Sequence, residues 1–161
     1  MGPRYDFFVS FTGADAEWAE WIAGEAQSIE NEQGRPCEVL FQKWDFVPGT
    51  SWAAMIDKGV RESRRIIPVL SPTYLDECPF GAAEWQAVWR RDPNGVTRSV
   101  VPVRVRECDP DGLLGPIVYI DLVGQPADAA RVALTSGLTA AISGVRPRRA
   151  VEFPGDENPI P

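Results

Sequence analysis

The chain has 161 residues, 44% of them hydrophobic, so it can bury one good core, whereas two domains would each be too small for stability. Histidine is absent, which excludes Ser-His-Asp and Cys-His catalysis, histidine-ligated zinc and histidine pH switches. A formal net charge of −7 argues against a general nucleic-acid binder, because neutralising phosphates requires a clustered basic surface.

The first part of the chain predicts a buried strand followed by an amphipathic helix. Residues 5–11, Tyr-Asp-Phe-Phe-Val-Ser-Phe, form an aromatic-rich apolar run that is too short for a helix and typical of a buried strand. Apolar residues then recur at helical spacing and predict a helix over residues 14–28. Asp15 precedes most of this helix, so we expect its side chain to cap it.

A second strand, a loop and a second helix are expected next. Residues 37–42 predict the strand, and residues 43–51 predict a loop whose Pro48-Gly49 pair is typical of a turn. Ser51 is expected to cap the helix, which the apolar spacing places over residues 52–62.

Three further strands and two helices complete the pattern. Residues 64–71 form a near-continuous hydrophobic run, which is typical of the centre of a parallel sheet. Pro68 within this run has no N–H, so we expect a local irregularity or a nitrogen that faces away from the neighbouring strand. The other strands are expected over residues 99–105 and 117–123, and the helices over residues 81–89 and 127–142.

Strands and helices therefore alternate along the chain. Right-handed crossovers fold such a pattern into an α/β architecture, a doubly wound parallel sheet with helices on both faces. We predict a flavodoxin-like five-stranded sheet of order 2-1-3-4-5 in one domain, residues 1–144. Residues 145–161 contain four prolines and many charges, and they predict an extended linker or tail that leads to a further domain of a longer protein.

The sequence also bears on location and redox state. It has no run of 18 or more apolar residues and no charged-then-apolar leader before Tyr5. We therefore expect that the chain has no membrane span and no signal peptide, and that it is located in the cytoplasm. Cys37, Cys78 and Cys108 are odd in number and far apart, which fits neither a disulfide framework nor a Cys-x-x-Cys metal site. We expect reduced thiols in or near the core, and no bound metal.

Several segments, taken together, resemble the Toll/interleukin-1 receptor (TIR) domain family over roughly residues 4 to 143. Residues 5–11 are similar to the first-strand box of that family, and residues 41–49 resemble the second-strand end and the BB loop. The most specific match is Ser-Arg-Arg-Ile-Ile-Pro-Val-Leu-Ser-Pro-Thr-Tyr-Leu, residues 63–75. One such box alone is a weak signal, but several in the right order form a strong one.

The resemblance implies a catalytic site for NAD hydrolysis. Enzymatic members carry a glutamate on the helix after the third strand, and Glu84 stands at that position, with Phe80 where tryptophan is usual. The implied site lies beyond the carboxyl ends of the strands. The implied substrate-binding residues are Phe11, Thr12, Gly13, Asp15, Trp44, Asp45 and Phe80, and the implied interaction loop comprises Phe46, Val47, Pro48 and Gly49.

The chemistry of this bond suits a chain without histidine. Cleavage between nicotinamide and ribose gives the ribose oxocarbenium character, which one nearby carboxylate stabilises. Nicotinamide is a good leaving group, so a single carboxylate is sufficient. The chain has neither Gly-x-Gly-x-x-Gly nor a P-loop lysine, so NAD is expected as a substrate, and no cofactor is expected.

Each candidate residue also has a purely structural interpretation. Glu84 could be an ordinary exposed helix residue, and Asp15 could be a helix cap whose contact with substrate is secondary. The Arg64-Arg65 pair is interpreted as entering a strand with both guanidinium groups solvated. Packing on helix faces is the structural interpretation of the tryptophans Trp18, Trp21, Trp52, Trp85 and Trp89.

Two functions remain open. The first is an NAD hydrolase that acts as the effector of a bacterial immune or stress system; the excess of arginine over lysine, 14 to 2, is typical of a GC-rich bacterial genome. The second is a non-catalytic module that recruits other TIR domains through the interaction loop. A response-regulator-like domain shares the topology, but the acidic pair that would bind magnesium after the first strand is missing, because Asp6 precedes the apolar part of that strand.

Overall fold

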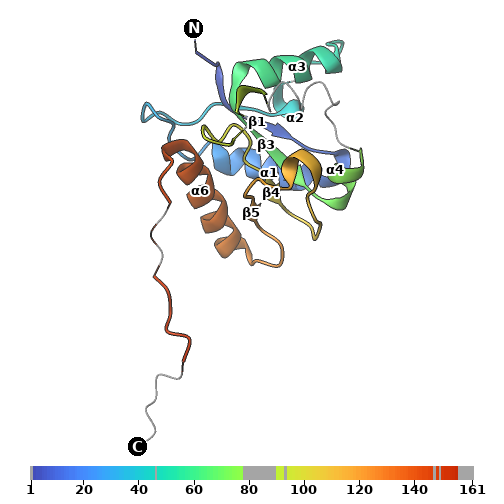
Figure 1. Cartoon of the computed structure of the whole chain (residues 1–161). Helices are drawn as coiled ribbons and strands as arrows, with labels where there is room; N and C mark the ends of the chain where they lie inside the picture. Colours follow the sequence, from blue (N-terminus) through green and yellow to red (C-terminus); the bar gives the residue numbers. More distant parts are fainter. Residues whose placement is uncertain are drawn as a thin grey trace, which may run out of the picture.

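The computed structural model shows a parallel sheet covered by helices on both faces (Figure 1). It describes residues 2–45, 47–77, 90–92, 94–146, 148 and 150–155. The strand order is β2-β1-β3-β4-β5, which confirms the predicted order 2-1-3-4-5. The strands are β1 (Tyr5–Ser10), β2 (Val39–Leu40), β3 (Ser63–Leu70), β4 (Val103–Arg104) and β5 (Ile120–Asp121).

Side chains that alternate along the strands divide the core into two layers. Phe7 and Val9 face one side of the sheet, where α1 (Ala16–Ala26) and α6 (Ala127–Ser143) pack against them. Phe8 faces the other side, against α3 (Trp52–Glu62) and α4 (Pro72–Glu77). This period of two is what a strand buried on both faces requires. The remaining short elements are η1 (Gly13–Asp15), α2 (Gln42–Asp45) and η2 (Gly112–Leu114).

Two prolines shorten the sheet on the β4 side. The amide of Ile66 donates to Ser99 and its carbonyl accepts from Val101, but the regular β3–β4 pairing resumes only at Val69, beyond Pro68. The predicted irregularity at Pro68 is confirmed, since a proline cannot donate to the ladder. Pro102 likewise offers β5 only its carbonyl, which accepts from Ile120 at 2.8 Å.

Each of the strands β2, β4 and β5 is shorter than predicted, at two residues. For β2 the cause lies at its end, where the chain turns into α2 at Gln42 and does not continue as a strand. The Asp45 carboxylate accepts from the amide of Phe41 at 2.8 Å, and the amide of Asp45 donates to the carbonyl of Phe41 at 3.0 Å. These two local bonds favour a helical turn, so the prediction of a loop from residue 43 was wrong in its first three residues.

Other local predictions hold, with one exception. Ser51 caps α3, its hydroxyl accepting from the amide of Ala54 at 3.4 Å. Trp18 and Trp21 pack edge to face against each other and lie against the core. The prediction that Arg65 is solvated was wrong: its guanidinium is buried and donates to Glu32 at 2.9 Å. The side chain of Trp52 and all of Trp85 and Trp89 lie outside the described residues.

The described cysteines agree with their interpretation, and the described part of the tail is exposed. Cys37 is buried and free, and burial raises the pKa of its thiol to about 12, which leaves it protonated and unreactive. Cys108 is free and half-buried, and Cys78 lies outside the described residues. The described residues beyond Gly144 are exposed and lead away from the domain (Figure 1). Among the described helices, none has the length and apolarity needed to cross a membrane.

Candidate functional site

Three neighbouring strands end at one edge of the sheet, and a polar side chain follows each of them. Asp15 follows β1, Ser71 follows β3 and Arg106 follows β4. Ligands of doubly wound sheets bind beyond the carboxyl ends of the strands, where the strand order reverses. The order reverses at β1, which lies between β2 and β3. This edge is therefore the candidate site.

Asp15 is the centre of the polar cluster. Only 1% of it is exposed. One carboxylate oxygen, Oδ2, accepts from the hydroxyl of Thr12 at 3.2 Å and from the hydroxyl of Ser71. The other, Oδ1, accepts from Nε of Arg106 at 2.9 Å. A buried charge is tolerated only with such compensation, so these three donors explain why a carboxylate sits here.

The prediction that the Asp15 side chain caps the first helix was wrong. Asp15 does occupy the N-cap position of α1, but its side chain makes no capping bond there. The turn η1 precedes α1 and brings the Asp15 carboxylate to the carboxyl edge of the sheet, where it binds Ser71 and Arg106. The local spacing that predicts a cap contains no information about donors 56 and 91 residues away.

Ser71 connects this cluster to α4. Its hydroxyl donates to Asp15 and accepts from the amide of Tyr74 at 3.1 Å, so it caps α4, with Pro72 in the first helical position. The hydroxyl of Tyr74 in turn lies 3.0 Å from that of Ser10, at the end of β1. The start of α4 is thus fixed to the ends of both β1 and β3.

Arg106 lines a cavity that the sequence analysis missed. The cavity measures about 540 Å³, and Arg106 comes to it from the loop after β4. Its position two residues beyond a parallel strand was the available signal, because such loops carry the ligand-binding residues of this architecture. The remaining lining residues come from the start of α1 and the turn before it: Gly13, Ala14, Asp15, Ala16, Glu17 and Trp18.

The predicted aromatic residues form a row next to this edge. The rings of Phe11 and Phe41 lie 5.2 Å apart, and those of Phe41 and Trp44 lie 4.9 Å apart in an edge-to-face arrangement. Phe41, which sequence reasoning did not single out, joins the two predicted rings. Trp44 is exposed and offers a free ring face or edge, whereas the Asp45 carboxylate is already engaged by a backbone amide.

The predicted interaction loop is exposed where it is described. Val47, Pro48 and Gly49 are all exposed, and the amide of Thr50 donates to the carbonyl of Val47 at 3.0 Å, which closes the predicted turn. Gly49 has φ +91°, a backbone conformation that L-residues rarely adopt. Phe46 lies outside the described residues.

Glu84 and Phe80 also lie outside the described residues, but both ends of their segment are anchored. The chain enters it at Glu77, the last residue of α4, near the carboxyl edge of the sheet. After it, Arg91 donates to the carbonyls of Val60 at 3.0 Å and Ser63 at 3.3 Å, beside the amino end of β3. The described residues on the two sides, Glu77 and Arg91, thus both belong to the connection from β3 to β4.

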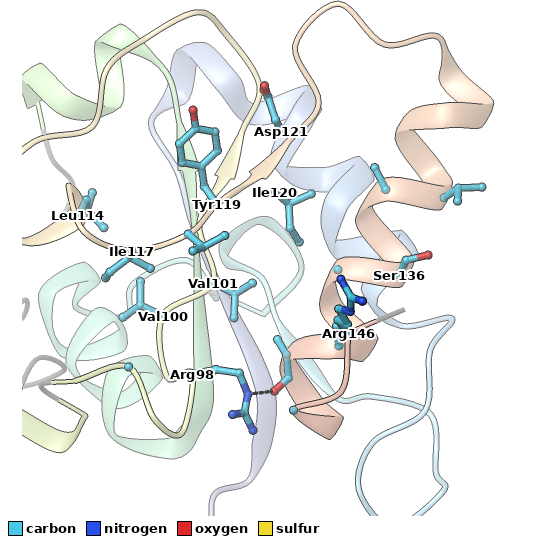
Figure 2. A pocket seen from close by; sticks show the side chains of 18 of the residues that line it. Arg98, Val100, Val101, Leu114, Ile117, Tyr119, Ile120, Asp121, Ser136 and Arg146 are labelled. Atoms are coloured by element: carbon cyan, nitrogen blue, oxygen red, sulfur yellow. Dashed lines mark hydrogen bonds between the residues drawn. The ribbon is translucent and has the colours of Figure 1, made fainter. Parts of the chain in front are cut away.

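A larger groove of about 1550 Å³ lies elsewhere, between α6 and the β4–β5 side of the sheet (Figure 2). Val101 and Ile120 line its floor, and Arg98 crosses one end, where its Nε donates to the carbonyl of Ala141 at 2.6 Å (Figure 2). None of the described residues of the predicted site lines this groove. Within the described part of the chain, no group of acidic residues and cysteines is arranged to hold a metal ion.

The family model of the TIR domain matches residues 7–135. This chain belongs to the TIR domain family. No match to a curated protein sequence was found.

Solved structures share the fold of this TIR domain. The TIR domain of the Toll-related receptor TRR-2 from Hydra magnipapillata is 18% identical, with a TM-score of 0.60, over 86% of this chain and 98% of that one. A TIR-STING receptor from C. gigas is 21% identical, with a TM-score of 0.59, over 83% of this chain and 41% of the receptor. A prokaryotic SEFIR domain is 13% identical, with a TM-score of 0.52, over 98% of this chain and 99% of that one.

The residues predicted for substrate binding by this TIR domain fall into two described groups. Thr12, Gly13 and Asp15 lie together at the polar cluster, where Thr12 is buried and its hydroxyl serves Asp15. Phe11 and Trp44 belong to the aromatic row and do not line the cavity beside Arg106.

Proposed function

We propose that this TIR domain is a bacterial, cytoplasmic NAD hydrolase, the effector of an immune or stress system. It releases nicotinamide together with ADP-ribose or a cyclic or variant ADP-ribose. The observation that carries the proposal is the polar cavity of Asp15 and Arg106 at the carboxyl edge of β1, β3 and β4, the edge at which the family resemblance implies the substrate site.

Chain length limits where Glu84 can act. Glu84 is the seventh residue after Glu77, where α4 ends. An extended chain of that length spans about 25 Å at most, so the proposal requires the Glu84 carboxylate to act within that distance of the end of α4. The hydrogen bonds of Ser71 and Tyr74 fix the start of α4, so the segment leaves from a defined point.

The proposed reaction is a substitution at the anomeric carbon of the ribose attached to nicotinamide. The bond to nicotinamide breaks, and nicotinamide leaves with the bonding electron pair as a neutral molecule. Glu84 stabilises the positive charge that develops on the ribose, and a water oxygen, or a nucleophilic atom of the same molecule in the cyclic product, bonds to that carbon and releases a proton. No histidine is needed at any step, in agreement with its absence from the chain.

The aromatic row gives this proposal a place for a ring of the substrate. Trp44 is exposed and packs on Phe41, which in turn packs on Phe11, so its indole is held by a second and a third ring. A flat heteroaromatic ring such as adenine or nicotinamide stacks favourably on such a held indole. NAD is the substrate in this scheme, and no cofactor takes part.

Replacing the glutamate tests the proposal. Glu84→Gln is expected to lower nicotinamide release by about 100-fold or more, because an amide cannot stabilise positive charge as a carboxylate does. The measurement is chromatography of nicotinamide and ADP-ribose species after concentrated protein is incubated with NAD. Glu77→Gln is the matched control, since it removes an exposed carboxylate at the end of α4 and should leave the rate unchanged. Equal rates for Glu84→Gln and the unsubstituted protein would exclude Glu84 as the catalytic residue.

The second candidate function is a non-catalytic module that binds other TIR domains. The exposure of Val47, Pro48 and Gly49 on a closed turn favours it, because an exposed apolar loop is a feature of protein-binding surfaces. The partners would be further copies of this TIR domain, brought together by a sensor or oligomerisation domain that follows residue 161. Self-association without any NAD cleavage, at all protein concentrations, would favour this function over hydrolysis.

A further inference from the structure

Arg106 is held in a way that leaves its binding face free. Its Nε donates to Oδ1 of Asp15 at 2.9 Å, while 55% of its side chain remains exposed. Among the described residues, neither terminal nitrogen, Nη1 or Nη2, has a hydrogen-bond partner. The guanidinium is thus fixed through one edge and presents its two outer N–H₂ groups to the cavity.

An ordinary surface ion pair would not fix the guanidinium in this way. Exposed pairs join two mobile side chains and contribute little. Here the Asp15 carboxylate is buried, and the hydroxyls of Thr12 and Ser71 donate to Oδ2, the oxygen that Arg106 does not contact. The carboxylate therefore stays in place when the arginine side chain moves. The entropy of ordering the guanidinium is already lost before a ligand arrives, and such preorganisation favours binding.

The chemistry of the free face selects an oxyanion. A guanidinium offers two parallel N–H donors, which match two oxygens of a phosphate or diphosphate group. The cavity, about 540 Å³, is lined on its other side by the first turn of α1, whose positive dipole end also favours an anion. Two carboxylates line the same cavity and oppose an anion: that of Asp15, which Arg106 and two hydroxyls compensate, and that of Glu17 in the first turn of α1.

We propose that Arg106, held by Asp15, binds the diphosphate of NAD and positions the dinucleotide at the carboxyl edge of the sheet. This inference rests on the proposed function for the identity of the ligand. Arg106 is a binding residue in this scheme, and Asp15 is a positioning residue that acts through it.

Binding measurements separate this inference from catalysis. The protein is titrated with NAD, inorganic pyrophosphate and adenosine, by calorimetry and by following the ¹⁵N–¹H signals of the arginine Nε groups. We expect NAD and pyrophosphate to shift the Arg106 signal and adenosine to leave it unmoved. In Arg106→Gln the affinity for NAD and pyrophosphate should fall about 10- to 100-fold, the amount expected for loss of hydrogen bonds to a charged group, while that for adenosine stays the same.

Arg131→Gln is the matched control. Arg131 is exposed to a similar extent, 51%, and its Nε donates to Glu25 at 3.0 Å, but it lies on α6, outside the cavity. Arg106→Lys keeps the charge and loses the paired donors, so it should weaken NAD binding by less than Arg106→Gln does. Glu17→Gln should strengthen the binding of NAD and of pyrophosphate several-fold, since it removes a repelling carboxylate. If Arg106→Gln fails to fold, the result for Glu17→Gln tests the diphosphate site in its place.

The outcomes for the two proposals are distinguishable. Unchanged NAD affinity in folded Arg106→Gln, or in Glu17→Gln, would overturn the diphosphate site even if NAD is cleaved normally. A protein that binds NAD and pyrophosphate through Arg106 but releases no nicotinamide would retain the site and overturn the hydrolase. Failure of the unsubstituted protein to bind either anion would overturn the inference.

Discussion

Asp15 illustrates how burial defines the role of a single side chain. An exposed aspartate at the start of a helix binds water and local amides, whereas Asp15 has exchanged its hydration for two hydroxyl donors and one guanidinium. Each donor arrives from a different part of the chain, so the carboxylate joins the ends of three strands. A residue with these constraints orients its neighbours, and Arg106 is the neighbour that remains accessible to a ligand.

A second arginine–carboxylate pair predicts a pH dependence of stability. Nε and Nη2 of Arg104 donate to the two oxygens of Asp121 at 3.1 and 2.8 Å, and this paired hydrogen bond holds the pKa of Asp121 below its usual range. Because the folded-state pKa is the lower one, the pair stabilises the fold above the unfolded carboxyl pKa of about 3.9. That stabilisation disappears as the pH falls through the lowered pKa.

Asp121→Asn should therefore lower the melting temperature by a few degrees at pH 7 and by clearly less near pH 2, where the carboxyl group becomes protonated. The effect is small because the Asp121 side chain is partly exposed to solvent. The measurement is thermal unfolding of both proteins at the two pH values. Asp128→Asn is the control, since Asp128 is fully exposed and lies 3.8 Å from its partner Arg131. A loss of equal size at both pH values would show that the charge of Asp121 is not the cause.

At the scale of elements, strands that are buried on both faces were predictable, and the edges of the sheet were not. The length of β3 can be read from its hydrophobic run, because both faces of this strand are covered and its side chains must be apolar or shielded from water. β4 and β5 read as seven-residue strands, yet Pro102 removes a donor between them and only two residues of each pair. The pattern of side chains does not show which backbone N–H groups the sheet needs for pairing, so it overestimates the length of such strands.

The residues of the candidate site were likewise predicted only in part. The family resemblance implied Thr12, Gly13 and Asp15 in the polar cluster and Phe11 and Trp44 in the aromatic row. Phe41 and Arg106 were missed: one was hidden inside a predicted strand, and the other depends on a contact that spans 91 residues.

The turn at Gly49 allows a sharp test of the interaction loop. Gly49→Arg forces an L-residue into φ +91°, so the turn should rearrange, and both self-association and NAD cleavage should fall severalfold or more. Gly34→Arg is the matched control, because Gly34 also has a positive φ, +72°, with no atom near its missing side chain, and lies in another loop. Sedimentation and nicotinamide release, measured over a range of concentrations, report both effects. Equal losses in the two variants would attribute the effect to strain in general and contradict a role for this loop.

At the scale of the whole molecule, the domain and its tail meet at Gly144. This residue ends α6 in the left-handed conformation, with φ +72°, and its amide donates to the carbonyl of Ala140 at 2.8 Å. Arg98 holds the same helix end through the carbonyl of Ala141. Both contacts belong to residues up to 144, so the last helix is closed without help from the tail.

Removal of residues 145–161 should therefore change the melting temperature by no more than about 2 °C and leave any NAD cleavage by the isolated domain intact. The physical reason is that the described tail residues are exposed and none of them belongs to the buried core. Thermal unfolding and nicotinamide release of the protein truncated after Gly144 provide the measurement. Three tail residues, Arg146, Arg148 and Ala150, line the end of the large groove beside α6. A fall of many degrees would show that the tail packs into that groove and is part of the folded domain.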